Sequence, residues 1–78
     1  MMRAIVWSKT DCGNCVMAKN LLRNEGVEYE ERNISTGPWT REQLLAAVPD
    51  ARTLPQVILD GNLIGGYDQL KKHFESKS

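Results

Sequence analysis

The chain contains two cysteines, Cys12 and Cys15, and they are separated by Gly13 and Asn14. An apolar run typical of a strand precedes them, and a pattern typical of a helix follows. At the start of a helix the first backbone N–H groups lack partners and the helix dipole is positive, so both stabilise the anion of a thiol held there. The thiolate is the form of cysteine that attacks disulfides. This spacing and setting predict a redox centre.

Structural and metal-binding roles fit the cysteine pair less well. A disulfide between them closes a very short loop, so it stabilises the fold little. Structural zinc takes four ligands, but the sequence offers no third cysteine and a single histidine, His73, which we interpret as a solvated helix residue. The segment before the motif is too short for a signal peptide and is typical of a strand. We therefore expect a protein of the reducing cytoplasm, where such a pair is catalytic or metal-binding more often than structural.

The composition narrows the range of partners. The 78 residues are enough for one domain, residues 1–78. Ten basic and ten acidic side chains cancel, without the basic excess of nucleic-acid-binding domains. No apolar run approaches the roughly 18 residues of a membrane span. We expect a monomer that binds neither nucleic acid nor a membrane.

A strand and a helix are expected to position the cysteines. Residues 4–7 are continuously apolar, as in a strand covered on both faces. The helix, residues 14–25, ends before Gly26, a residue common just after helix C-termini. Its inward stripe is predicted to consist of Met17, Ala18, Leu21 and Leu22. The first strand, this helix and a second strand at residues 27–30 together predict a right-handed parallel β-α-β unit.

A second helix is expected to follow an exposed strand. Apolar and charged residues alternate in 27–30, which is typical of a sheet edge. Thr40 and Gln43 predict a capping box at the start of the helix, and Pro38 as its first residue is the alternative. The side chains expected to face inward are Leu44, Leu45 and Val48.

The last third of the chain predicts a hairpin and a closing helix. Residues 57–59 are expected to form a buried strand, and Asp60-Gly61 is typical of a hairpin turn. Residues 63–64 are expected to form the short second strand of this hairpin. The final helix is expected to begin near Asp68 as N-cap, with Tyr67, Leu70 and Phe74 docking it. The order β-α-β-α-β-β-α predicts an α/β fold with a four-stranded mixed sheet between helices.

Three motifs in this order resemble the glutaredoxins, most of all short bacteriophage and bacterial dithiol members. They are Cys12-Gly13-Asn14-Cys15 with Lys9 before it, Thr53-Leu54-Pro55 before the third strand, and Gly65-Gly66-Tyr67-Asp68 before the last helix. The resemblance implies the thioredoxin fold with sheet order 2-1-3-4, glutathione as reductant, and a cis bond before Pro55. Two departures are Gly13-Asn14, where Pro-Tyr is common, and Gln69, where an acidic residue is frequent.

The chemistry expected of the cysteines follows from their positions. Cys12 is the predicted nucleophile, with the helix start and Lys9 favouring its anion and Asp11 opposing it. Cys15 is the predicted resolving thiol, buried one turn further on, which attacks the mixed disulfide at Cys12. An inert core cysteine is the alternative for Cys15.

The resemblance also implies a glutathione site. Leu54 would offer its backbone N–H and C=O to the cysteinyl part of glutathione, as a short added strand does. Gly66 would let the backbone approach the ligand, and Asp68 at the helix start would hold the γ-glutamyl end. The residues assigned to glutathione are Lys9, Thr53, Leu54, Pro55, Gly66, Tyr67 and Asp68, with Arg52 in the same region. A solvated Lys9, a plain N-cap at Asp68, and core positions for Trp7 and Tyr67 are the alternatives, and Trp39 is expected to pack at its helix start.

The implied function is a glutathione-dependent thiol-disulfide oxidoreductase. It would reduce protein disulfides and glutathione mixed disulfides, with ribonucleotide reductase as a candidate partner. No permanent cofactor is expected, and glutathione is the co-substrate. The alternatives are a redoxin reduced by thioredoxin reductase and a carrier of a glutathione-ligated [2Fe–2S] cluster, which Gly13 leaves open.

Overall fold

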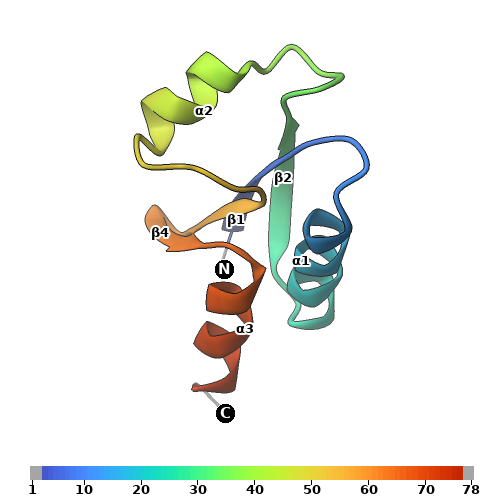
Figure 1. Cartoon of the computed structure of the whole chain (residues 1–78). Helices are drawn as coiled ribbons and strands as arrows, with labels where there is room; N and C mark the ends of the chain where they lie inside the picture. The colour runs from blue at the N-terminus through green and yellow to red at the C-terminus, as the bar shows by residue number, and fades with distance from the viewer. Residues whose placement is uncertain (1–2, 77–78) are drawn as a thin grey trace.

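The strands and helices follow one another in the predicted order β-α-β-α-β-β-α (Figure 1). A computed structural model describes residues 3–76, so the outermost two residues at each end of the predicted domain lie outside the described part. The elements are β1 (Arg3–Ser8), α1 (Gly13–Asn24), β2 (Glu28–Asn33), α2 (Arg41–Ala47), β3 (Gln56–Leu59), β4 (Asn62–Gly65) and α3 (Tyr67–Glu75).

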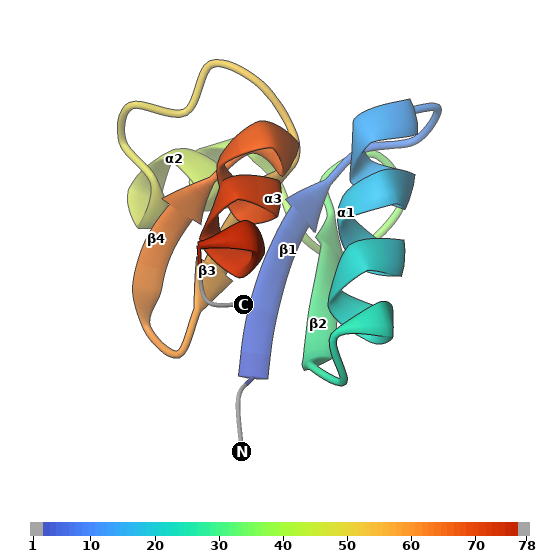
Figure 2. The ribbon, with the colours of Figure 1, turned by 90° about the horizontal axis from the view of Figure 1, so that it is seen from below.

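The four strands form one mixed sheet in the order β2-β1-β3-β4. β1 runs parallel to β2, and the pairs β1–β3 and β3–β4 are antiparallel. Figure 2 shows α1 and α3 on one face of the sheet and α2 on the other. The predicted order and the thioredoxin fold are therefore confirmed, and β1 lies at the centre of the sheet with the cysteines at its end.

Alternating residues of β1 divide the core into two halves. Ala4 and Val6 are buried beneath α1 and α3, together with Leu22 and Leu70 from those helices. Trp7 points to the opposite face, where it packs with residues of α2 and is 1% exposed. This alternation is what a strand covered on both faces requires, so Trp7 fills core.

The inward faces of α1 and α2 are narrower than predicted. The buried residues of α1 are Cys15, Ala18 and Leu22, spaced by three and four, and Leu21 is only partly buried at their flank. Met17 falls outside this stripe and is 47% exposed, so its predicted inward position is wrong. Leu45 is wrong for the same reason, because α2 presents Leu44 and its C-cap Val48 to the sheet.

The start of α2 follows the predicted capping box. The Gln43 N–H donates to Thr40 Oγ1 at 3.1 Å, and the Thr40 N–H donates to Gln43 Oε1 at 2.8 Å. The helix therefore begins at Arg41, and the alternative start at Pro38 is wrong.

The start of α3 differs from the prediction. The N-cap is Gly66 rather than Asp68, which lies in the first turn. The Gln69 side chain takes the place of a capping side chain, because its Oε1 accepts the Gly66 N–H at 3.1 Å. His73 is half-buried rather than solvated, since it shares the inward face of the helix with Leu70 and Phe74. Its Nε2 is buried without a hydrogen-bond partner among residues 3–76.

The hairpin between β3 and β4 turns at Asp60-Gly61, as predicted. Both residues have positive φ, 49° and 83°, as the favoured two-residue hairpin turn requires. The Arg3 N–H donates to Asp60 Oδ1 at 2.9 Å, which ties the turn to the start of β1. None of the helices within residues 3–76 is long and apolar enough to cross a membrane.

Candidate active site

Cys12 is the N-cap of α1. Its Sγ accepts the Cys15 N–H at 3.1 Å, and its carbonyl accepts the Val16 N–H at 3.2 Å. The helix therefore begins at Gly13, one residue before the predicted start, and directs one of its unpaired N–H groups at the sulfur. A thiolate at this position receives the hydrogen bond and the positive end of the helix dipole, so both lower the energy of the anion.

The two sulfurs are joined in this structure and differ in burial. Cys12 and Cys15 form a disulfide, with their Cα atoms 5.2 Å apart. Cys15 is 1% exposed, whereas Cys12 is only half-buried. Cys12 is therefore the more accessible sulfur, and Cys15 lies behind it, between α1 and the sheet.

The Thr53-Leu54-Pro55 motif lies beside Cys12. The Leu54–Pro55 peptide bond is cis, as the resemblance implied. The Leu54 carbonyl oxygen lies 3.7 Å from Cys12 Sγ, a contact in the disulfide form, where the sulfur carries no hydrogen. The Gln56 side-chain amide donates to the Thr53 carbonyl at 2.8 Å and so fixes the turn that presents Leu54.

The Gly66-Tyr67-Asp68 motif adjoins the proline turn. A Cβ on Gly66 would lie 3.2 Å from Gln69 Oε1 and 3.6 Å from the Pro55 carbonyl oxygen, so the N-cap of α3 lies close to the proline turn. Asp68 is exposed in the first turn of α3, and Tyr67 is partly buried against the core beneath α1 and α3. Cys12 thus adjoins the proline turn, and the proline turn adjoins the start of α3.

Three cations surround the other side of the proline turn. Lys9, Arg41 and Arg52 line a small cavity of about 70 Å³ together with Thr53 and Leu54. The structure therefore brings Lys9 and Arg52 to the motif as predicted. Sequence reasoning missed Arg41, although its place directly after the capping residue of α2 fixes where it lies.

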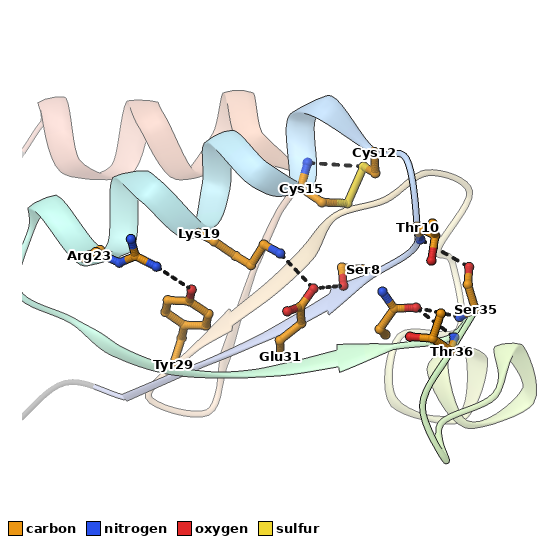
Figure 3. Close-up of polar contacts among 11 residues, drawn as sticks. Ser8, Thr10, Cys12, Cys15, Lys19, Arg23, Tyr29, Glu31, Ser35 and Thr36 are labelled. Carbon is orange, nitrogen blue, oxygen red and sulfur yellow. Dashed lines mark hydrogen bonds and ion pairs between the residues drawn. A yellow bond between two sulfur atoms is a disulfide. The ribbon is translucent and has the colours of Figure 1, made fainter.

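A second polar group on the β2 side of the cysteines was also missed. Glu31 Oε2 accepts hydrogen bonds from Lys19 Nζ at 2.8 Å and from Ser8 Oγ at 2.6 Å (Figure 3). These two hydrogen bonds, first that of Lys19, lower the pKa of the Glu31 carboxyl below its usual value. Lys19 and Glu31 line a cavity of about 590 Å³ with Cys12 and Cys15.

Trp39 packs ahead of α2, as predicted. Its ring meets Trp7 edge-on, with centroids 5.6 Å apart. The Arg32 guanidinium lies 4.2 Å from the centre of the Trp39 ring and 5.2 Å from that of Trp7, within the range of cation–π attraction. Trp39 thus connects the loop before α2 to the central strand.

The described residues contain no metal-binding cluster. Within residues 3–76, no three His, Cys, Asp or Glu side chains are grouped so that they could hold a metal ion.

The sequence of this chain is similar to those of known glutaredoxins. The glutaredoxin family model matches residues 4–64. Glutaredoxin 3 of Escherichia coli is 33% identical over 70 residues, which cover 90% of this chain and 83% of that protein. A hybrid peroxiredoxin of Haemophilus influenzae is 38% identical over 69 residues, and mitochondrial glutaredoxin-2 of Pongo abelii is 32% identical over 76. These stretches cover 88% and 94% of this chain but only 28% and 47% of the two relatives, so the chain spans less than half of their length.

Solved structures agree with the sequence comparisons. Glutaredoxin 1 of Francisella tularensis superposes with a TM-score of 0.82, covering 99% of this chain and 96% of that one, and its 21% identity supports the fold alone. A buckwheat glutaredoxin–glutathione complex superposes with a TM-score of 0.77 at 32% identity, covering 95% of this chain and 70% of that chain.

Proposed function

The chain belongs to the glutaredoxin family, and on this premise we propose that it is a glutathione-dependent thiol-disulfide oxidoreductase. One observation carries the proposal: the more accessible sulfur of the pair, Cys12, caps α1 and lies 3.7 Å from the Leu54 carbonyl. A nucleophile and a backbone edge for a peptide-like ligand are therefore side by side. Glutathione is such a ligand, and the buckwheat relative is described in complex with it.

The reaction uses both cysteines in sequence. The Cys12 thiolate attacks one sulfur of the substrate disulfide, and the other substrate sulfur leaves as a thiolate that takes a proton from solvent. Cys15 then attacks Cys12 Sγ and releases the second substrate thiolate. The substrate has gained two electrons, and the protein is left with the Cys12–Cys15 disulfide found in this structure. Two glutathione molecules restore the dithiol and leave as glutathione disulfide.

The surface around Cys12 supports a binding mode for glutathione. The backbone of Leu54 pairs with the cysteinyl part, which directs the glutathione sulfur at Cys12. Lys9, Arg41 and Arg52 attract the glycyl carboxylate on one side of the turn. On the other side, Gly66 lets the backbone approach the γ-glutamyl end, and Asp68 and the first N–H groups of α3 hold its ammonium and carboxylate.

A comparison of two electron sources tests the proposal. Turnover of a small disulfide is measured with glutathione and glutathione reductase, and separately with thioredoxin reductase as the only source of electrons. We expect turnover with glutathione and none above background with the other reductase. The reverse result would overturn glutathione dependence, and full turnover by Cys12→Ser with glutathione would overturn the role of Cys12.

The two cysteine roles separate by substrate. Cys15→Ser should retain activity toward glutathione mixed disulfides, which need only Cys12, and lose reduction of protein disulfides. Equal loss of both would contradict the roles. The same variant holds protein substrates as mixed disulfides, so identifying the captured proteins tests the proposed donation of electrons to protein disulfides such as that of ribonucleotide reductase. We further propose a cytoplasmic monomer, which sedimentation of the purified protein and cell fractionation would test.

A further inference from the structure

We propose that Lys19 is a positioning residue for the resolving step, holding a positive charge beside Cys15 so that this buried thiol ionises when it must attack Cys12. The inference rests on the proposed function, because it takes Cys15 as the resolving thiol. It goes further by naming the group that makes that thiol reactive.

Lys19 occupies the right place on α1. It follows Cys15 by four residues, so the two side chains lie on the same face of the helix, one turn apart. Both line the cavity of about 590 Å³ on the β2 side of the cysteines. Figure 3 shows Lys19 reaching from the helix toward the strands on the side where Cys15 projects.

Two strands fix the ammonium group there. Lys19 Nζ lies 2.8 Å from Glu31 Oε2 on β2, and the same oxygen accepts the hydroxyl of the fully buried Ser8 on β1. The Ser8 hydroxyl of β1 thus orients the Glu31 carboxylate, and the Lys19 ammonium of α1 forms an ion pair with it. Glu31 Oε2 already accepts hydrogen bonds from Lys19 and Ser8, and these bonds lower the pKa of the carboxyl, which makes it a weak proton acceptor. Glu31 therefore serves as an anchor for Lys19 and not as a base for Cys15.

Few other charges face Cys15. The loop before α1 contributes Lys9 and Asp11, which are exposed, opposite in sign and therefore screened by water. Within residues 3–76, β3 and α3 add no charged side chain to this cavity. The N–H group that could stabilise a thiolate from the helix start points at Cys12 instead. Lys19, with 22% of its side chain exposed, is the best-shielded cation near the buried thiol.

The step is balanced without any added reagent. In the mixed disulfide, the Cys15 thiol gives its proton to water in the cavity, and the thiolate that remains is stabilised by Lys19. This thiolate attacks Cys12 Sγ, forms the Cys12–Cys15 bond and breaks the bond to the substrate sulfur. That sulfur leaves with the electron pair and is protonated by solvent.

The test follows the resolving step alone, with no glutathione present. Fully reduced protein is mixed with DTNB, an aromatic disulfide whose thiolate product is coloured. The first release of colour reports attack by Cys12. The second, whose rate does not depend on DTNB concentration, reports attack by Cys15, and it is recorded over a range of pH for wild type and Lys19→Met.

We expect Lys19→Met to raise the pH midpoint of the second phase by about one unit. At neutral pH about tenfold less thiolate is then present, and a thiolate of higher pKa is about threefold more nucleophilic, so the net rate falls about threefold. Lys19→Arg should keep the wild-type midpoint. Lys19→Met/Glu31→Gln should move the midpoint only part of the way back toward wild type, because the uncompensated carboxylate is gone but the positive charge is still missing. A complete return would overturn the inference, since Lys19 would then serve only to neutralise Glu31. Lys71→Met, at an exposed lysine of α3, is the matched control.

An unchanged midpoint in Lys19→Met would overturn the inference, as would an equal shift in Lys71→Met. A shift in Lys19→Arg as large as that in Lys19→Met would also overturn it, because packing rather than charge would then be responsible. The DTNB reaction needs no glutathione. A protein that shows the predicted shift but no turnover with glutathione would therefore support Lys19 and refute the proposed function.

Discussion

The cap formed by Cys12 can be separated from its chemistry by two substitutions. Its Sγ accepts the Cys15 N–H at 3.1 Å, at a position where serine is among the best residues and alanine among the worst. Cys12→Ser should therefore preserve the start of α1, and Cys12→Ala should leave that N–H without its partner. Both variants should lose disulfide reduction completely, because neither has the nucleophile.

The expected difference in stability is that of an N-cap. Replacing a capping side chain by alanine costs about 1 kcal/mol, within a range of about 0.5–2 kcal/mol. In a domain of this size, about 1 kcal/mol changes the Tm by about 4–8 °C. Cys12→Ala should therefore melt about 4–8 °C below Cys12→Ser.

The measurement is urea and thermal unfolding of the two variants in excess reductant, so that Cys15 forms no disulfide between molecules. The free energies of unfolding are compared directly between serine and alanine, since both lack the Cys12–Cys15 bond. Equal stability of the two variants would refute the capping argument. Residual activity in Cys12→Ser would refute the assignment of the nucleophile.

Three further predictions concern the frame around the site. Leu70→Ala, at a fully buried residue, should lower the free energy of unfolding in urea by about 2–5 kcal/mol. Leu63→Ala, at a residue 55% exposed, should change it by less than about 1 kcal/mol, and equal losses in the two variants would contradict the described core. The pKa of Glu31 is lower in the folded state, so the ionised carboxylate contributes to the free energy of unfolding above the unfolded pKa near 4.5, and this contribution is lost as the pH falls through the folded pKa. Glu31→Gln should therefore make the free energy of unfolding less dependent on pH below about pH 5. The same pH dependence of unfolding in wild type and variant would refute this. Gly65→Ala, at a residue with φ of 115°, should lower the free energy of unfolding by about 1–2 kcal/mol and so lower the Tm. Gly13→Ala should leave the Tm nearly unchanged, because its added Cβ meets nothing within 4 Å. Equal Tm values for the two variants would contradict the positive φ of Gly65.

The frame of the fold could be predicted because its signals are local. The capping box of Thr40 and Gln43 and the hairpin turn at Asp60-Gly61 each depend on residues within one turn of chain, and both were confirmed. Met17 and Leu45 were assigned wrongly because apolar character does not show how wide a stripe the sheet covers. The N-cap of α3 was misplaced because Gln69 caps a glycine, a role its sequence position does not reveal.

The same distinction holds at the candidate site. The motifs around Cys12, Pro55 and Gly66 lie together as the resemblance implied, because their order along the chain fixes where the thioredoxin fold puts them. The pairing of Lys19 with Glu31 could not be predicted, because one lies on a helix and the other on a strand twelve residues later. Only the right-handed β-α-β unit brings them together.

The most direct measurement is the pH dependence of mixed-disulfide formation between glutathione disulfide and Cys15→Ser, followed by mass spectrometry. Cys12 is then the only thiol in the chain. The helix N-terminus predicts rapid addition of one glutathione, with a pH midpoint well below the value of about 8.5 that is usual for cysteine. A midpoint at or above the usual value would contradict a Cys12 thiolate stabilised by α1. The absence of any adduct would contradict glutathione as the co-substrate.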